Sequence, residues 1–130
     1  MAYLIDTNIF IHARDGTASV QRKFALHAGT IAISALCLAE LQRGLIAPSA
    51  DLLRRERHRL LIQNLAVLPF DAAAADAYGR IVAQVGRIKT RDFDHLIAAH
   101  ALAVNATLVT DDEPDFAGIA GLALENWLAP

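Results

Sequence analysis

The sequence has a single cysteine, few aromatic residues and almost no net charge, and each shortage argues against a class of protein. One cysteine, Cys37, cannot form an internal disulfide, and in the apolar stretch "SALCLAEL" we expect it to pack in the core. A formal net charge of −2 gives no general basic surface of the kind that nucleic-acid-binding proteins often have. Aromatic residues make up 6% of the chain, so we expect few platforms for stacking bases.

Long hydrophobic runs and a secretory leader are missing as well. The longest apolar stretch, around residues 31–39, is interrupted by Ser34 and is too short to cross a bilayer. The first apolar segment contains Asp6 and follows no basic region, so we expect a cytoplasmic protein without membrane contact. The 130 residues, 55% of them hydrophobic, suit a single domain over residues 1–130 with a generous core.

Strand-like apolar runs alternate with helical patterns along the chain, which is typical of an α/β fold with a mostly parallel sheet. Ser34 and Asp71 are expected to cap two of the helices, and Gly86 to end one. The predicted helices span residues 34–46, 51–65, 71–86 and 92–105. The predicted strands span residues 3–5, 30–33, 66–68, 107–109 and, with a weaker pattern, 122–124.

Acidic side chains follow two of the predicted strands. "YLIDTN" places Asp6 directly after the first strand, and "TLVTDDEPDF" places Asp112 after the fourth. Because the carboxyl ends of parallel strands meet at one edge of a sheet, we expect these two acids to lie close together. Glu40 in "LCLAELQRGL" and Asp94 before "LIAAHAL" add two acids beside apolar helix faces. A turn, a helix cap or an exposed helix edge would explain each acid taken alone.

Four carboxylates at one sheet edge would raise each other's pKa unless a cation held them together. Oxygen ligands without a cysteine set or paired histidines suit Mg²⁺ or Mn²⁺ better than zinc. His95 and His100 are five residues apart and so on different faces of a helix, where packing or surface roles are expected. The acids therefore predict a divalent-metal site for phosphoryl chemistry.

Four segments resemble the PIN-domain ribonucleases, and most closely the VapC-type toxins of type II toxin-antitoxin pairs. They are "LIDTNIFI", "SALCLAELQRG", "DHLIAAHALAVNATLVTDDEPDF" and "GLALENWL", which together extend over essentially the whole chain. The resemblance implies a PIN-like three-layer α/β/α fold with a sheet of four to five strands. It also implies that Asp6, Glu40 and Asp94 are the core catalytic and metal-binding acids, with Asp112 as the more variable fourth.

The fourth acid stays open among Asp111, Asp112 and Asp115, although the spacing from Asp94 favours Asp112. If Asp115 is not the fourth acid, we expect it to orient the metal-binding acids without binding the metal itself. Asn8 and Thr110 would orient the acids in the same way, as metal sites commonly require, and turn capping is an equally good explanation for both.

The resemblance further implies an activity and partners. We expect Mg²⁺-dependent hydrolysis of RNA, either tRNA or another structured RNA, by a metal-activated water without a covalent intermediate. The expected partners are a VapB-like antitoxin whose tail covers the active site and a second copy of the chain in a homodimer, which assembles further with the antitoxin. Arginine fits phosphate well, so Arg87, Lys89 and Arg91 are the preferred RNA contacts and the arginine run over residues 54–59 the second choice. A solvated helix face or loop explains both basic runs equally well.

The residues argue against two other functions. An aspartyl-phosphate phosphatase would use Asp6 as nucleophile and a second aspartate two residues later as general acid, but Asn8 occupies that position and cannot supply a proton. A non-catalytic protein-binding or RNA-binding module with the same fold would have no reason to maintain four mutually repelling acids. Both alternatives are therefore disfavoured.

Overall fold

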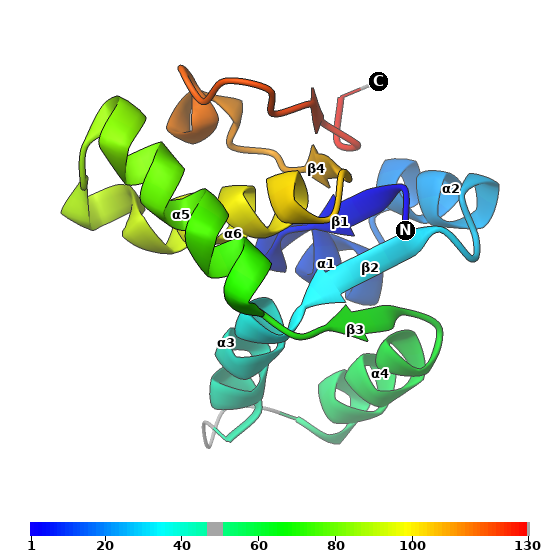
Figure 1. Ribbon diagram of the computed structural model, residues 1–130. Helices are drawn as coiled ribbons and strands as arrows, with labels where there is room; N and C mark the ends of the chain where they lie inside the picture. Colours follow the sequence, from blue (N-terminus) through cyan, green and yellow to red (C-terminus); the bar gives the residue numbers. More distant parts are fainter. Residues whose placement is uncertain (47–50, 130) are drawn as a thin grey trace.

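A five-stranded parallel sheet, in the order β3-β2-β1-β4-β5, forms the centre of the molecule in the computed structural model, which describes residues 1–46 and 51–129 (Figure 1). The predicted α/β fold with a parallel sheet is confirmed. The last strand begins two residues later than predicted. The strands are β1 (Tyr3–Ile5), β2 (Ile31–Ser34), β3 (Ala66–Leu68), β4 (Thr107–Val109) and β5 (Leu124–Glu125).

Helices connect the strands and cover both faces of the sheet. Helix α1 contacts α2, α3 and α4, whereas α5 packs along α6. Because parallel crossovers are right-handed and the chain moves first towards β3 and then back past β1 to β4, these two groups cover opposite faces (Figure 1). The helices are α1 (Thr7–Arg14), α2 (Ala18–Leu26), α3 (Ala35–Ile46), α4 (Leu52–Gln63), α5 (Ala72–Val85) and α6 (Asp92–Ala103), with 3₁₀ turns η1 (Lys89–Arg91) and η2 (Glu113–Phe116).

Helices α1 and α2 correct the sequence analysis, which expected only a polar turn after the first strand. Asp6 directly follows β1 and caps α1, since its carboxylate accepts a hydrogen bond from the backbone N–H of Ile9 at 2.9 Å. Helix α1 buries Ile9, Phe10 and Ala13. Helix α2 buries only Val20, so its sequence carries little of the periodic apolar signal by which helices are predicted.

The core lies on both sides of β1 and β2. Small residues allow α6 to pack closely on the sheet, and the apolar residues of α6 from Ile97 onward are largely buried. His95 and His100 are 3% and 1% exposed, which confirms a packing role for both. Cys37 is also buried, as predicted, and burial raises the pKa of its thiol to about 12. In the described part of the chain, no helix has the length and apolar character needed to cross a membrane.

The predicted helix ends are confirmed for α5 and modified for α3. The Asp71 carboxylate accepts a hydrogen bond from the backbone N–H of Ala74 at 3.0 Å, and Gly86 ends α5 with a φ of +77° that glycine adopts readily. Ser34 is the last residue of β2, and its hydroxyl accepts a hydrogen bond from the N–H of Leu36 at 3.1 Å. It thus satisfies one free N–H group at the start of α3.

Candidate active site

The strand order reverses direction between β1 and β4, and this is the point where parallel sheets bind ligands. Ile5 of β1 pairs with Val109 of β4, and the Asp6 N–H donates to the Val109 carbonyl at 3.0 Å. The residues that follow, Asp6 and Thr110, therefore lie side by side at the carboxyl edge of the sheet.

A cavity of about 290 Å³ opens at this edge. All four predicted acids line it, although they come from the end of β1, from α3, from α6 and from the segment after β4. Asn8 lines it too, from the first turn of α1. The complete lining is Asp6, Thr7, Asn8, Glu40, Phe93, Asp94, Ile97 and Asp112.

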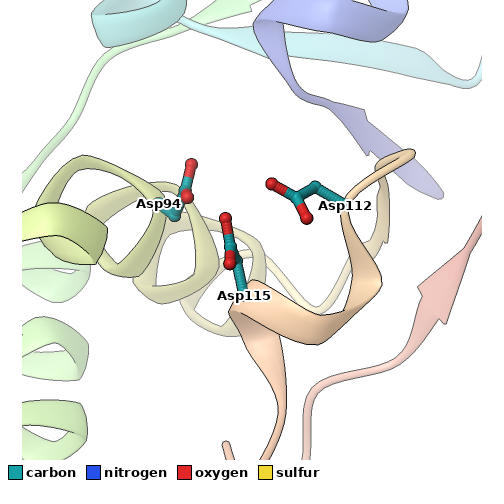
Figure 2. A group of neighbouring side chains, drawn as sticks. All are labelled: Asp94, Asp112 and Asp115. Carbon is teal, nitrogen blue, oxygen red and sulfur yellow. The ribbon is translucent and has the colours of Figure 1, made fainter.

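Three carboxylates form the tightest acidic group among the described residues. Asp94, Asp112 and Asp115 point towards one another, and one oxygen of each lies within 4.8 Å of the others (Figure 2). Asp115 reaches this position because η2 turns the chain back after β4, with the Asp115 N–H bonded to the Asp112 carbonyl at 3.1 Å. From the sequence, Asp115 was open either as the fourth acid or as a supporting residue. The structure places its carboxylate beside those of Asp94 and Asp112, while Asp6 and Glu40 lie elsewhere on the cavity wall.

The surroundings of Asp6, Asp94 and Asp112 disfavour negative charge when no cation is present. Burial raises the pKa of Asp6 to about 6, although hydrogen bonds from Thr110 and from the Ile9 N–H partly oppose that effect. Burial also raises the pKa of Asp94 to about 6, with further contributions from Asp115 and Asp112. The pKa of Asp112 is raised as well, mainly by a hydrogen bond with Asp115 and to a smaller extent by burial. An oxygen-only site that holds protons this tightly has the donor chemistry for a hard divalent cation.

Thr110 links the two halves of the site. Its buried hydroxyl accepts a hydrogen bond from the Asp112 N–H at 3.0 Å and also hydrogen-bonds the Asp6 carboxylate, to which it must donate. It therefore both caps the turn and orients an acid, which are the two roles considered from the sequence.

Asp111 is oriented towards α1 and is not among the residues that line the cavity. One of its oxygens lies 3.9 Å from Nε2 of His12, whose Nδ1 is 3.0 Å from the Thr17 hydroxyl. Its other oxygen is buried and has no hydrogen-bond partner in the described part of the chain. Of the three acids considered for the fourth position, Asp112 and Asp115 thus reach the acidic group and Asp111 does not.

The three basic residues before α6 are placed differently from one another. Nε of Arg91 lies 3.4 Å from a carboxylate oxygen of Asp115, a member of the acidic group. Arg87 instead donates to Asp92 at 3.2 Å, and Lys89 belongs to η1. The arginine run over residues 54–59 lies on α4, where Arg59 pairs with Glu56. The structure therefore brings Arg91 closest to the acids.

The comparisons with known proteins agree with this geometry. Residues 3–122 match the PIN domain family. The chain belongs to the PIN-domain family. Among its relatives are ribonuclease VapC2 of Rickettsia felis, at 37% identity, and the tRNA(fMet)-specific endonuclease VapC of Shigella flexneri, at 33% identity. Each alignment covers 98% of both chains, which places this PIN domain among the VapC ribonucleases.

Solved PIN-domain structures share the whole fold. VapBC2 of Rickettsia felis, bound to a DNA fragment from its promoter, has a TM-score of 0.85 and 35% identity, and the match covers 98% of this chain and 99% of the other. DNA-bound VapBC of Salmonella typhimurium has a TM-score of 0.81 and 26% identity, with 98% of each chain covered. The predicted three-layer α/β/α fold of the family is confirmed.

One residue of the PIN-domain cavity was not considered from the sequence. Phe93 lines the cavity beside Asp94 and is 36% exposed. The available signal was "RDFDH", in which an aromatic residue stands between two acids at the beginning of a helix, a position where a core side chain is not expected.

Proposed function

We propose that this chain is a metal-dependent endoribonuclease and the toxin of a toxin-antitoxin pair. The observation that carries the proposal is the convergence of Asp6, Glu40, Asp94 and Asp112 in one cavity, with Asp115 beside two of them, at the point where the strand order of a VapC-family PIN domain reverses. The relatives are named as ribonucleases and tRNA endonucleases, which supports RNA as the substrate class.

The proposed catalytic and metal-binding acids are Asp6, Glu40, Asp94 and Asp112, because all four line the cavity. Asp115 is proposed as a further ligand, since its carboxylate lies beside those of Asp94 and Asp112. Mg²⁺ is the preferred ion because every donor is a carboxylate oxygen, and Mn²⁺ accepts the same ligands. A bound ion of this kind polarises a phosphodiester and lowers the pKa of water. Asp6 is fixed by the Thr110 hydroxyl and by the Ile9 N–H, so its carboxylate is held in one position.

The proposed RNA contacts follow the placement of the basic residues. Arg91 can reach a phosphate beside the acidic group, and its pairing with Asp115 holds its guanidinium there. Arg87 and Lys89 would contact the RNA further along its backbone. Asn8 is exposed on the cavity wall and is proposed to orient a ligand or the substrate.

The proposed partners come from the neighbouring structures. The solved neighbours named VapBC contain a VapC with its partner, and for this chain we propose a VapB-like antitoxin that covers the acidic cavity. We also propose a single domain over residues 1–130, a homodimer that assembles further with the antitoxin, a tRNA or another structured RNA as substrate, and action in the cytoplasm.

The experiment that tests the function compares RNA cleavage by the unaltered chain with cleavage by Asp94→Asn. We expect cleavage in Mg²⁺ or Mn²⁺, none in EDTA, and a loss of about a thousandfold in Asp94→Asn, since a metal contributes several kcal/mol to this chemistry. Asp76→Asn, on the exposed surface of α5, is the matched control and should cleave normally. Full activity in EDTA, or in a folded Asp94→Asn protein, would contradict the metal mechanism.

A further inference from the structure

Phe93 forms part of the wall between the acidic cavity and a second cavity. The second cavity has a volume of about 270 Å³ and is lined by Leu36, Ala39, Glu40, Arg43 and Phe93. Glu40 and Phe93 belong to both cavities. Among the described residues, Phe93 is also the most exposed aromatic side chain. An apolar hollow with an accessible aromatic ring therefore adjoins the acidic group directly.

The residues on either side of Phe93 are both engaged in other contacts. Asp92 accepts hydrogen bonds from the Tyr78 hydroxyl and, at 3.2 Å, from the Arg87 guanidinium. Asp94 points into the acidic group (Figure 2). The backbone at Phe93 is thus held from two sides, so little conformational entropy is lost when a flat ligand packs on its ring.

The chemistry of the second cavity suits a flat group with polar edges. Leu36 and Ala39 provide apolar surface, and Phe93 provides a π face. Arg43 is exposed at this cavity and forms no ion pair with any residue in the described ranges. A guanidinium without a partner beside an aromatic ring can donate to the polar edge of a base or to a phosphate.

We propose that the nucleobase next to the scissile phosphate stacks on Phe93 in the second cavity, with Arg43 contacting the same nucleotide. The inference rests on the proposed function, because a phosphodiester at the acidic group is what brings a base to this position. A base is joined through its sugar to the phosphate, and the two cavities share a wall, so one nucleotide can occupy both. Every base can stack on an aromatic ring, so this site would increase RNA affinity without making binding sequence-specific.

The test measures RNA affinity directly instead of cleavage. The probes are an oligoadenylate RNA and an abasic oligonucleotide of the same length, each in Ca²⁺ after absence of cleavage has been checked. Phe93→Leu keeps an apolar side chain but removes the ring, and it should weaken oligoadenylate binding about five-fold to a hundredfold. Phe93→Trp should restore the affinity, and Leu26→Ala, at an exposed site on α2, should leave it unchanged.

Further readouts separate stacking from a structural role. All variants should bind the abasic oligonucleotide equally, and calorimetry should give the same Mn²⁺ affinity for Phe93→Leu as for the unaltered chain. Equal binding of oligoadenylate by Phe93→Leu and the unaltered chain, no oligoadenylate binding at all, or an equal loss with the abasic probe would overturn the inference. So would conversion of a dimer into a monomer by Phe93→Leu, because a second copy would then cover the cavity. Absence of cleavage by the unaltered chain in Mg²⁺ and Mn²⁺ would instead overturn the proposed function.

Discussion

The two ends of the same strands are built from opposite kinds of interaction. At the amino ends, Trp127 is 1% exposed, stacks on His27 with 5.6 Å between ring centroids, and packs edge-on against Tyr3 of β1. Its indole N–H is satisfied by Glu125 at 3.1 Å. At the carboxyl ends, Asp6 and Asp94 are partly buried, and their pKa values are raised to about 6. One end of the sheet thus stabilises the fold, whereas the other retains carboxylates whose negative charge is disfavoured mainly by burial and is compensated only by protons or a cation.

Removing the aromatic ring at the amino end should have the largest effect on stability. Trp127→Ala deletes a fully buried side chain, and we expect the free energy of unfolding to fall by about 3–5 kcal/mol in urea denaturation. Trp127→Phe, which keeps an aromatic ring, should lose less. Mn²⁺ affinity of the folded fraction should not change, and a parallel loss of metal binding would show that the two ends are energetically coupled.

Removing one charge at the carboxyl end should instead increase the free energy of unfolding. At pH 7 without metal, Asp6→Asn should stabilise the protein by about 1–3 kcal/mol, because it removes a carboxylate whose ionisation the fold disfavours. Asparagine retains the N-cap of α1. Thermal denaturation in EDTA measures the gain, and added Mg²⁺ should raise the melting temperature less than in the unaltered chain. Asp76→Asn is the control, and a destabilised Asp6→Asn would refute the inference that burial disfavours the ionised Asp6 carboxylate.

The pH dependence of stability sharpens the same contrast. The folded pKa of Asp6, about 6, lies above its unfolded value of 3.8, so its stabilising contribution is complete below pH 4 and is lost as the pH rises towards 6 and above. Burial lowers the pKa of His58 and His100, so these two histidines make the protein more stable as the pH rises through about 6, opposite to the effect of Asp6. The quantity to measure is therefore the stability of the unaltered chain minus that of Asp6→Asn, from pH 4 to pH 7.5 in EDTA. This difference should decrease with pH, and a difference independent of pH would disprove the assignment to Asp6.

Substitution of Thr110 should cause the smallest change in stability. Thr110→Val keeps the side-chain shape but removes a hydroxyl that serves both Asp6 and the Asp112 N–H, and we expect a cost of about 1 kcal/mol. The pKa of Asp6 should rise further, because the hydrogen bond that lowers it is gone. Carboxylate titration by NMR measures that shift, and Thr110→Ser should leave it close to the original value. An unchanged pKa in Thr110→Val would contradict the link between the two acids.

The sheet and the position of the site could be predicted from local sequence patterns. Short apolar runs that end in Asp6 and in Thr110 mark the carboxyl ends of β1 and β4, and parallel strands bring such ends together whatever the loops do. Helix α2 could not be predicted in the same way, because Val20 is its only buried residue and its apolar pattern is correspondingly faint.

The spacing of acids along the sequence could not predict which of them belong to the acidic group, because that depends on how the chain folds after β4. Asp115 joins Asp94 only because η2 folds back, whereas Asp111, four residues earlier, points towards His12. The accessible ring of Phe93 was equally hidden, because a low aromatic content describes the whole chain and says nothing about where one ring is placed. Sequence patterns therefore located the site, and tertiary contacts chose its members.

The pairing of β1 with β4 has a consequence for the order in which the protein is made. Strand β1 leaves the ribosome about a hundred residues before its partner Thr107–Val109, and the Thr110 N–H is bonded to the Glu125 carbonyl of β5. A nascent chain that stops short of β5 therefore lacks the strand that secures one wall of the acidic cavity. The site therefore forms only after β1, β4 and β5 have all been synthesised, so a nascent chain that has not yet reached β5 does not have the complete acidic cavity.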